Sequence, residues 1–177
     1  MFEFLKNEKI SYSVYSENFE LKEDNIKVVY DILKKNFYKK YPKKVNFREY
    51  TEFKYNLLSF VNKKNNYIFT INRNNKIVGF SIGVLKNKTF FESHIYIHPK
   101  HQGKKLGSKL SLRVLGYTRS NLGIKKFIPL NVENNAIFDI NKHIAERKNK
   151  SKSVKYSLKK DKNHNIFNKN ANYIYVK

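Results

Sequence analysis

The stretch 95–110, "IYIHPKHQGKKLGSKL", begins as an apolar strand and ends as a helix. The loop between them carries Gln102, Gly103, Gly107 and three lysines. The first turn of a helix has backbone N–H groups without intrahelical partners and the positive end of the helix dipole. Small residues let a ligand approach these groups closely. The loop is therefore typical of an anion site, and a phosphorylated ligand is the expected occupant.

Length and composition limit the class of protein. The 177 residues suit one ordinary domain, and 40% hydrophobic residues can fill a single core. The chain has no cysteine, which excludes a disulfide framework, a thiolate metal site and a cysteine nucleophile. No apolar run approaches the ~18–20 residues of a bilayer span, and the N-terminus lacks a signal-peptide core. We therefore expect a soluble cytoplasmic protein with no membrane partner.

The positive charge is unevenly distributed. The formal net charge is +23; residues 1–60 carry 12 Lys and Arg against 9 Asp and Glu, whereas residues 61–177 carry 25 against 5. Such a field attracts polyanions, so nucleic acid is one candidate partner. However, 32 of the 37 basic residues are lysine, as codon bias in an AT-rich genome would produce, and a phosphate-reading groove would more often use arginine. Both interpretations stay open.

The first 60 residues predict one strand and two helices. "SYSVYS" (11–16) alternates weakly and predicts an edge strand within a weak N-terminal strand segment, 10–22. Apolar residues at helical spacing predict a helix over 24–39 that ends before Pro42. "VNFRE" (45–49) predicts a capping box with Asn46 as N-cap and Glu49 at N3, opening a second helix that continues through Phe60.

The following residues switch to period two. "NYIFTI", "KIVGFSIGVL" and "TFFESHIYI" predict a three-strand antiparallel meander over 66–97, with an Asn-rich turn between the first two strands. A helix from Leu106 should end at Gly123 as the C′ residue. "KKFIPLNV" predicts the next strand, and three isoleucines between 137 and 144 mark another helix. "SVKYSL" and "ANYIYV" predict a final strand pair in the basic segment 146–177. Residues 1–177 are interpreted as a single domain.

This order of elements, with the anion loop after the fourth strand, resembles the GCN5-related N-acetyltransferase (GNAT) family. The family's loop pattern is Gln/Arg-x-x-Gly-x-Gly/Ala after a strand that ends in apolar-x-Pro; this chain reads Ile97-His98-Pro99 and then "QGKKLGS" over 102–108. "LGI" (122–124) and "VENNAI" (132–137) also resemble family segments. The resemblance covers 11–177 and is sharpest over 91–138. It implies an α+β fold, an α/β/α sandwich with a central, mostly antiparallel mixed sheet flanked by helices.

The resemblance also implies acetyl-CoA as co-substrate and no metal ion. The cofactor pyrophosphate would be bound by the loop Gln102, Gly103, Lys104, Lys105, Leu106, Gly107 and Ser108, the strand Ile95, Tyr96 and Ile97 would pair with the pantetheine arm, and Asn134 would touch the cofactor. Lys105 stands where the family usually has glycine. A side chain is tolerable there if the residue is already helical, and its ammonium group would reach the phosphates.

Acetyl transfer needs a base for the amine proton and an acid near the departing thiolate. Glu92, His94 and Tyr96 alternate along the fourth strand, which predicts that they share one face, and they are the candidate catalytic residues. The family's usual phase points to Phe91 and Ser93, unless a bulge shifts it. The alternative interpretation makes Glu92 and His94 the polar face of a half-buried strand. The tyrosine that the family often places after the fifth strand is missing near 140–141.

Two classes of function follow. The first is an acyl-CoA-dependent N-acyltransferase acting on a primary amine of a small molecule, a protein or an RNA-linked acceptor. The second is a catalytically degenerate GNAT-like protein that binds nucleic acid. The retained loop residues favour the first, while Lys105 and the missing tyrosine favour the second. If the lysine excess is compositional, the acceptor would be a small neutral or cationic amine. The sequence leaves the oligomeric state open, a homodimer included.

Overall fold

The computed structural model describes residues 9–17, 20–41, 46–128, 156–161 and 171–176, the last two ranges as backbone only. The elements follow in the order β1 (Ile10–Tyr15), α1 (Glu23–Lys40), α2 (Tyr50–Val61), β2 (Asn66–Arg73), β3 (Lys76–Lys86), β4 (Thr89–Ile97), the short 3-10 helix η1 (Pro99–His101), α3 (Leu106–Leu122), β5 (Lys126–Ile128), β6 (Tyr156–Asp161) and β7 (Ala171–Val176). Within the described residues, no helix is both long and apolar enough to cross a bilayer.

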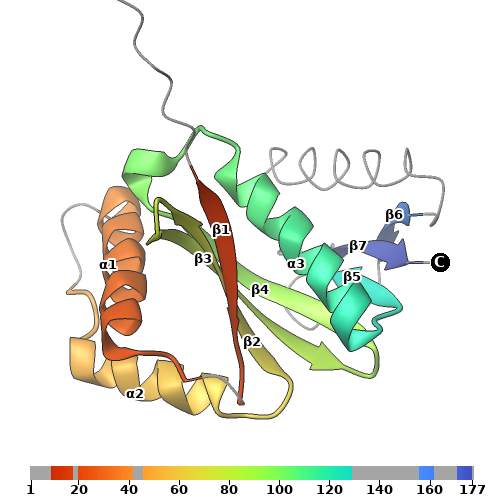
Figure 1. Ribbon diagram of the computed structural model, residues 1–177, viewed down its shortest axis with the longest axis horizontal. Coiled ribbons are helices and arrows are strands. Elements are labelled where there is room, and N and C mark those ends of the chain that lie inside the picture. The colour runs from red at the N-terminus through yellow and green to blue at the C-terminus, as the bar shows by residue number, and fades with distance from the viewer. Residues whose placement is uncertain (1–8, 18–19, 42–45, 129–155, 162–170, 177) are drawn as a thin grey trace, which may run out of the picture.

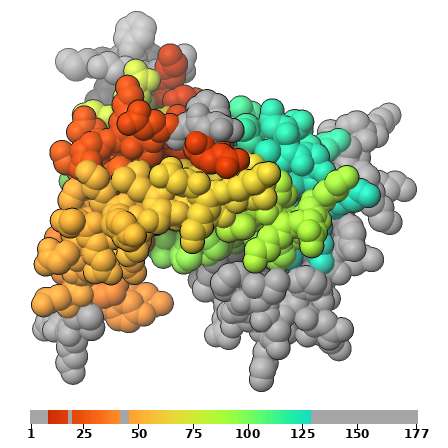
Figure 2. Space-filling view, turned by 90° about the horizontal axis from the view of Figure 1, so that it is seen from below, coloured from red at the N-terminus to blue at the C-terminus, as the bar shows by residue number. Residues whose placement is uncertain are grey.

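These strands form one mixed sheet in the order β1-β2-β3-β4-β5-β7-β6. Only β4 and β5 run parallel, and the other neighbours are antiparallel. Helices α1 and α2 lie on one face of the sheet and α3 on the other (Figure 1). Seen from below, the segment from α2 into β2 and β3 forms a continuous band across the molecule, with the end of α3 and β5 beyond it (Figure 2). The predicted α+β sandwich is confirmed.

Each face of the sheet has its own apolar core. Beneath α3, the fully buried Leu110 and Val114 pack on Phe69 and Phe90 of the sheet. Beneath α1 and α2, Ile26 and Val29 belong to a second cluster that includes Phe80 of β3. Strand residues alternate between the two clusters because successive side chains point to opposite faces. The sheet therefore separates an α3 side from an α1–α2 side.

The predicted turns are confirmed at the points where backbone conformation is most restricted. Asn74 and Asn75 between β2 and β3 have φ angles of 50° and 63°, as a tight hairpin turn requires. Gly123 caps α3 with a φ angle of 58°. The final strand pair is β6 and β7, which pair antiparallel. The helix predicted over 137–144 lies outside the described residues, as does Asn134.

The predicted capping box is wrong. Helix α2 begins at Tyr50, and its N-cap is Glu49, which has extended backbone and no capping hydrogen bond from its side chain. The Tyr50 hydroxyl donates to Glu23 of α1 at 2.5 Å, and its ring packs edge-on against Tyr30 at 5.3 Å. These contacts with α1 fix the start of α2, so tertiary packing overrides the local signal of Asn46.

Within the described residues, strands β4 and β5 pair through Thr89–Phe91 and Lys126–Ile128. On the β4 edge opposite β3, no strand partner is described from Ser93 to Ile97. A strand edge of this kind can pair through its backbone with a ligand that lies in extended conformation.

Candidate functional site

A cleft of about 890 Å³ opens between α1, α2 and strands β3 and β4. Its walls are mainly aromatic and aliphatic, with Phe37 from α1, Phe53 and Phe60 from α2, and Phe80 and Ile82 from β3. Ser93, His94 and Tyr96 of β4 also line it. The volume is in the range of small-molecule sites, which typically combine apolar walls with a few polar groups.

A β-bulge in β4 decides which side chains reach the cleft. Ile82 pairs with His94, while the next residue of β3, Gly83, pairs with Glu92, so Ser93 is an extra residue on β4. Beyond the bulge His94 and Tyr96 line the cleft, whereas Glu92 contacts α3 on the opposite face. The prediction that Glu92, His94 and Tyr96 share one face is therefore wrong, because simple alternation does not hold across the bulge.

Glu92 is buried on the α3 side and is 4% exposed. The hydroxyl of Ser81 donates to Oε1 and that of Ser111 to Oε2, both at 2.7 Å. These two bonds connect β4 to β3 and to α3. Both carboxylate oxygens are directed away from the cleft, and a catalytic role for Glu92 stays a prediction.

The Ser93 hydroxyl lies between the Ile82 carbonyl and His94 Nδ1, at 3.1 Å from each. When it donates its single proton to the carbonyl, it accepts a hydrogen bond from the imidazole. In that arrangement Nδ1 of His94 carries the proton and Nε2 keeps its lone pair. Among the described residues none hydrogen-bonds to Nε2. The imidazole thus offers the cleft a basic nitrogen.

The surroundings of His94 also favour its neutral form. The side chain opens to the cleft, yet the nearby protein partly desolvates the imidazolium and lowers the His94 pKa below its usual 6.5. His94 is therefore mostly neutral at pH 7. A neutral imidazole with a free Nε2 is able to accept a proton.

Tyr96 lies next to His94, with the two rings stacked at 6.0 Å. Burial raises the Tyr96 pKa, and the positive charges of Lys40 and Arg48 act in the opposite direction. Tyr96 keeps its proton at neutral pH and is a hydrogen-bond donor. Both cations line the same cleft.

The anion loop lies beyond the end of β4 and has two left-handed residues. Gly103 has a φ angle of 78°, and Lys105, the N-cap of α3, has φ 58° and ψ 17°. The condition under which a side chain would be tolerable here, a backbone that is already helical, is not met, since the position has the left-handed conformation that glycine adopts most easily. No side chain among the described residues caps α3, so the first N–H groups of Leu106, Gly107 and Ser108 remain available to an anion.

The left-handed conformation of Lys105 predicts a stability change. A residue with a side chain costs about 1–2 kcal/mol in this conformation. Glycine avoids that cost, but it increases the conformational entropy of the unfolded chain, which cancels part of the gain. We expect Lys105→Gly to raise the free energy of unfolding by about 1 kcal/mol in urea denaturation. Gly103→Ala, at the other left-handed position, should lower it. A less stable Lys105→Gly variant would contradict this account.

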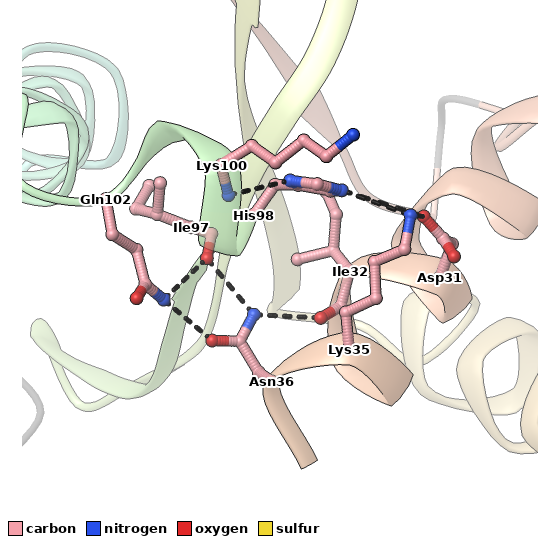
Figure 3. Close-up of polar contacts among 8 residues, drawn as sticks. All are labelled: Asp31, Ile32, Lys35, Asn36, Ile97, His98, Lys100 and Gln102. Carbon is pink, nitrogen blue, oxygen red and sulfur yellow. Dashed lines mark hydrogen bonds and ion pairs between the residues drawn. The ribbon is translucent and has the colours of Figure 1, made fainter. Parts of the chain in front are cut away.

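The Gln102 side chain ties the loop to α1 (Figure 3). Its Nε2 donates to Asn36 Oδ1 at 2.9 Å and to the Ile97 carbonyl at 3.0 Å, and its Oε1 accepts from Lys39 Nζ at 2.6 Å. Asn36 also donates to the Ile97 and Ile32 carbonyls at 3.1 and 2.8 Å. Because Asn36 and Lys39 line the cleft, one network joins the cleft wall to the loop.

His98 directly follows β4 and begins the segment that leads to the anion loop. Its backbone N–H donates to the Val78 carbonyl at 2.8 Å, and its Nδ1 accepts from the Lys100 N–H at 3.2 Å (Figure 3). Its ring lies 5.7 Å from that of His101. Across the described part of the chain, no three His, Asp or Glu side chains are grouped as metal ligands.

Several cleft residues were not predicted from the sequence. Asn36, Lys39 and Lys40 follow one another at i, i+3 and i+4, so they share one side of α1. That spacing was a usable signal for a polar rim beside the apolar face. Arg48 gave no comparable signal. Ser93 was indicated only by the usual phase of the family, and it reaches the cleft at the position of the bulge.

Known proteins similar to this chain share this architecture. The model of the acetyltransferase (GNAT) family matches residues 26–138. No curated protein matches the chain. Among solved structures, a chimera of the spermidine N-acetyltransferase SpeG from Vibrio cholerae and hSSAT has a TM-score of 0.61 at 14% identity, over 93% of this chain and 94% of that one. The PaiA N-acetyltransferase from Thermoplasma acidophilum, in complex with coenzyme A, has a TM-score of 0.61 at 12% identity, over 94% and 99% of the two chains.

A third similar structure is an aminoglycoside acetyltransferase from an uncultured soil metagenomic sample, in complex with sisomicin. Its TM-score is 0.58 at 14% identity, over 76% of this chain and 86% of that one. At these identities the likeness to solved structures is one of fold.

Proposed function

Because the chain belongs to the acetyltransferase (GNAT) family, we propose that it transfers the acetyl group of acetyl-CoA to the primary amine of a small acceptor in the cleft. The observation that carries this proposal is the position of His94. His94 lines an open cleft of substrate size with largely apolar walls, beside the β4 edge that leads to the anion loop, and its Nε2 is unprotonated when Nδ1 donates to Ser93. An amine bound there has a proton acceptor within the same cleft.

The residues divide the chemistry between them. Bound acetyl-CoA would supply the thioester carbonyl that the amine attacks, forming the C–N bond as the C–S bond breaks. His94 Nε2 takes the proton that the amine loses. Ser93 keeps the imidazole in the required tautomer. Tyr96 holds a proton on the same strand and is our candidate to protonate the thiolate, since no other tyrosine lines the described cleft except Tyr41.

We assign the cofactor to the loop and to the edge of β4 opposite β3. The backbone N–H groups from Gly103 to Ser108 would bind the pyrophosphate at the positive end of α3. Ile95, Tyr96 and Ile97 would pair with the pantetheine arm, which is supported by the absence of a described strand partner on this edge. Lys104 and Lys105 add positive charge. Asn134 stays a prediction outside the described residues.

The degenerate nucleic-acid-binding alternative receives less support. Lys105 departs from the family pattern. The loop nevertheless has left-handed backbone at Gly103 and Lys105, and no described side chain caps the first turn of α3, as an anion site needs. We therefore retain catalysis as the proposed function.

Acetyl-CoA should stabilise the protein against heat. At 100 times the dissociation constant, ligand binding adds about 2.7 kcal/mol to the free energy of unfolding, which differential scanning fluorimetry detects easily. Gly107→Val should weaken coenzyme A binding at least tenfold. A side chain at Gly107 would point over Ile95 and Ile97, within 3.8–4.0 Å at Cβ, and would lie where the pantetheine arm is proposed to pass.

Gly116→Val is the matched control for this test. Gly116 lies in the same helix, and a Cβ there would meet nothing within 4 Å. The control should bind coenzyme A as the wild type does. No thermal shift at millimolar acetyl-CoA in low salt would refute the proposed function, and normal binding by Gly107→Val would refute the assignment of the loop.

A further inference from the structure

The charge of the cleft restricts the amines that it can bind. Lys39, Lys40 and Arg48 line it, and the described lining residues include no aspartate or glutamate. The Lys39 ammonium group donates a hydrogen bond to the Gln102 side chain, which is neutral. Lys40 lies over the ring of Tyr41 at 5.3 Å, and no described carboxylate forms an ion pair with Lys40 or Arg48. The cleft therefore has a positive potential that its own residues do not neutralise.

The cations are placed next to the proposed chemistry. Lys40 and Arg48 both act electrostatically on Tyr96, whose ring stacks on that of His94. A polyamine in this cleft would bring further positive charge toward these groups and would find no described carboxylate to bind. Like charges brought together in this way disfavour binding, whereas an anionic group would be attracted.

The apolar walls of the cleft indicate the apolar part of the ligand. The cleft has aromatic surface from Phe37, Phe53, Phe60 and Phe80, and Ile82 adds aliphatic surface. Such surface contributes to affinity by removing the apolar body of a ligand from water. A purely polar acceptor, such as a sugar amine, would leave this surface unused.

From these observations we propose that the acceptor is a small primary amine with an aromatic or branched apolar body and an anionic group, and that Lys40 and Arg48 bind that group. The inference rests on the proposed function and adds the substrate class. The anionic group is a carboxylate or a phosphate, since a guanidinium binds either through two parallel N–H bonds. An amino acid such as phenylalanine has this combination of groups.

The same cations would assist the reaction. An ammonium group held near Lys40 and Arg48 is destabilised relative to the neutral amine, which lowers the pKa of the substrate nitrogen. The amine then gives up its proton to His94 more readily. The positive potential would thus serve binding through the anionic group and catalysis through the amine.

The test compares three aromatic amines that differ in the group beside the amine, together with one polyamine. L-Phenylalanine, L-phenylalaninamide, phenethylamine and spermidine are measured with the full chain, by calorimetry without cofactor and by release of coenzyme A from acetyl-CoA. The amide has the less basic amine, so it would be the better acceptor if the carboxylate were irrelevant. We expect phenylalanine to bind at least tenfold more tightly than phenethylamine, and spermidine not to bind. A phosphonate analogue of phenylalanine shows which anion is preferred.

Variants locate the anion contact. Arg48→Gln and Lys40→Gln should lower the preference for phenylalanine over phenethylamine at least tenfold, and Arg48→Glu should reverse it. Lys76→Gln removes an exposed charge from the start of β3, outside the cleft lining, and should leave the preference unchanged.

Binding, turnover and thermal shift together distinguish a failure of the proposed function from a failure of the proposed acceptor class. Tight binding of phenylalanine without turnover, when acetyl-CoA also gives no thermal shift, would refute the proposed function and leave the ligand class standing. Turnover of phenethylamine or spermidine in preference to phenylalanine would refute the ligand class alone. Equal binding of the acceptors, or no binding of any, would also overturn it.

Discussion

Replacing His94 with alanine is expected to lower kcat about 10²–10⁴-fold, the usual contribution of a positioned general base. The reason is the single unprotonated nitrogen that faces the cleft, which alanine removes. The loss should appear in kcat with little change in the dissociation constant of coenzyme A, because the proposed cofactor contacts are made by the loop and by the backbone of residues 95–97, not by the His94 side chain. Steady-state kinetics with a saturating amine, together with coenzyme A titration, measures both.

The pH profile gives an independent check on His94. A base works in its neutral form, and the His94 pKa is lowered by desolvation. The rate should therefore stay high as the pH falls to 6.5 and decline only as it passes through the lowered pKa. In His94→Ala this acidic limb should disappear. A limb that persists in the variant would assign the proton transfer to another group.

Ser93→Ala is the matched variant for comparison with His94→Ala. It removes the acceptor that holds the proton on Nδ1, so part of the imidazole population shifts to the tautomer with Nε2 protonated. We expect a smaller fall in kcat than in His94→Ala, with the acidic limb still present. An activity in Ser93→Ala as low as in His94→Ala would point to a contribution beyond orientation.

Most of the fold follows from patterns that depend on neighbours in the sequence. The meander from 66 to 97 was predictable because alternation and an Asn-Asn turn specify pairing between adjacent strands. The helix over 106–122 was predictable from apolar spacing and from Gly123 at its end. The start of α2 was not, since the bonds of Tyr50 to α1 decide it and no local motif encodes them.

The site was less predictable for the same physical reason. A bulge adds one residue to a strand, and no residue type in "FFESHIYI" marks the position at which it occurs. Without the bulge, Glu92 and His94 would share a face; with it, one is buried under α3 and the other reaches the cleft. The anion loop was easier to predict, because glycine and lysine at a strand-to-helix corner indicate close approach and attraction of an anion. Lys105 was the exception, since its left-handed backbone is more typical of glycine.

Glu92→Ala is expected to lower the free energy of unfolding by about 3 kcal/mol. A hydrogen bond to a charged group contributes about 1.5–3 kcal/mol, and the variant removes two while the relief of a buried charge offsets part of the loss. Ser81 and Ser111 would be left buried without this acceptor, because they are 0% and 5% exposed. For a domain of this size the melting temperature should fall by about 6–12 °C.

Two further variants separate packing from charge. Glu92→Gln keeps the shape and one acceptor oxygen, but its amide group must donate to the second serine, whose own proton then needs another partner. About half of the loss seen with alanine is expected. Glu52→Ala removes an exposed carboxylate from α2 and should leave the melting temperature within about 2 °C of the wild type.

Activity decides between the two roles considered for Glu92. If the carboxylate only connects β3, β4 and α3, Glu92→Gln should keep most of its kcat at a temperature well below its melting point. The pH profile should then retain the limb assigned to His94, since that imidazole is held by Ser93 rather than by Glu92. A stable Glu92→Gln variant with kcat reduced as far as in His94→Ala would instead make Glu92 the essential carboxylate, and the bulge at Ser93 would have to rearrange during turnover.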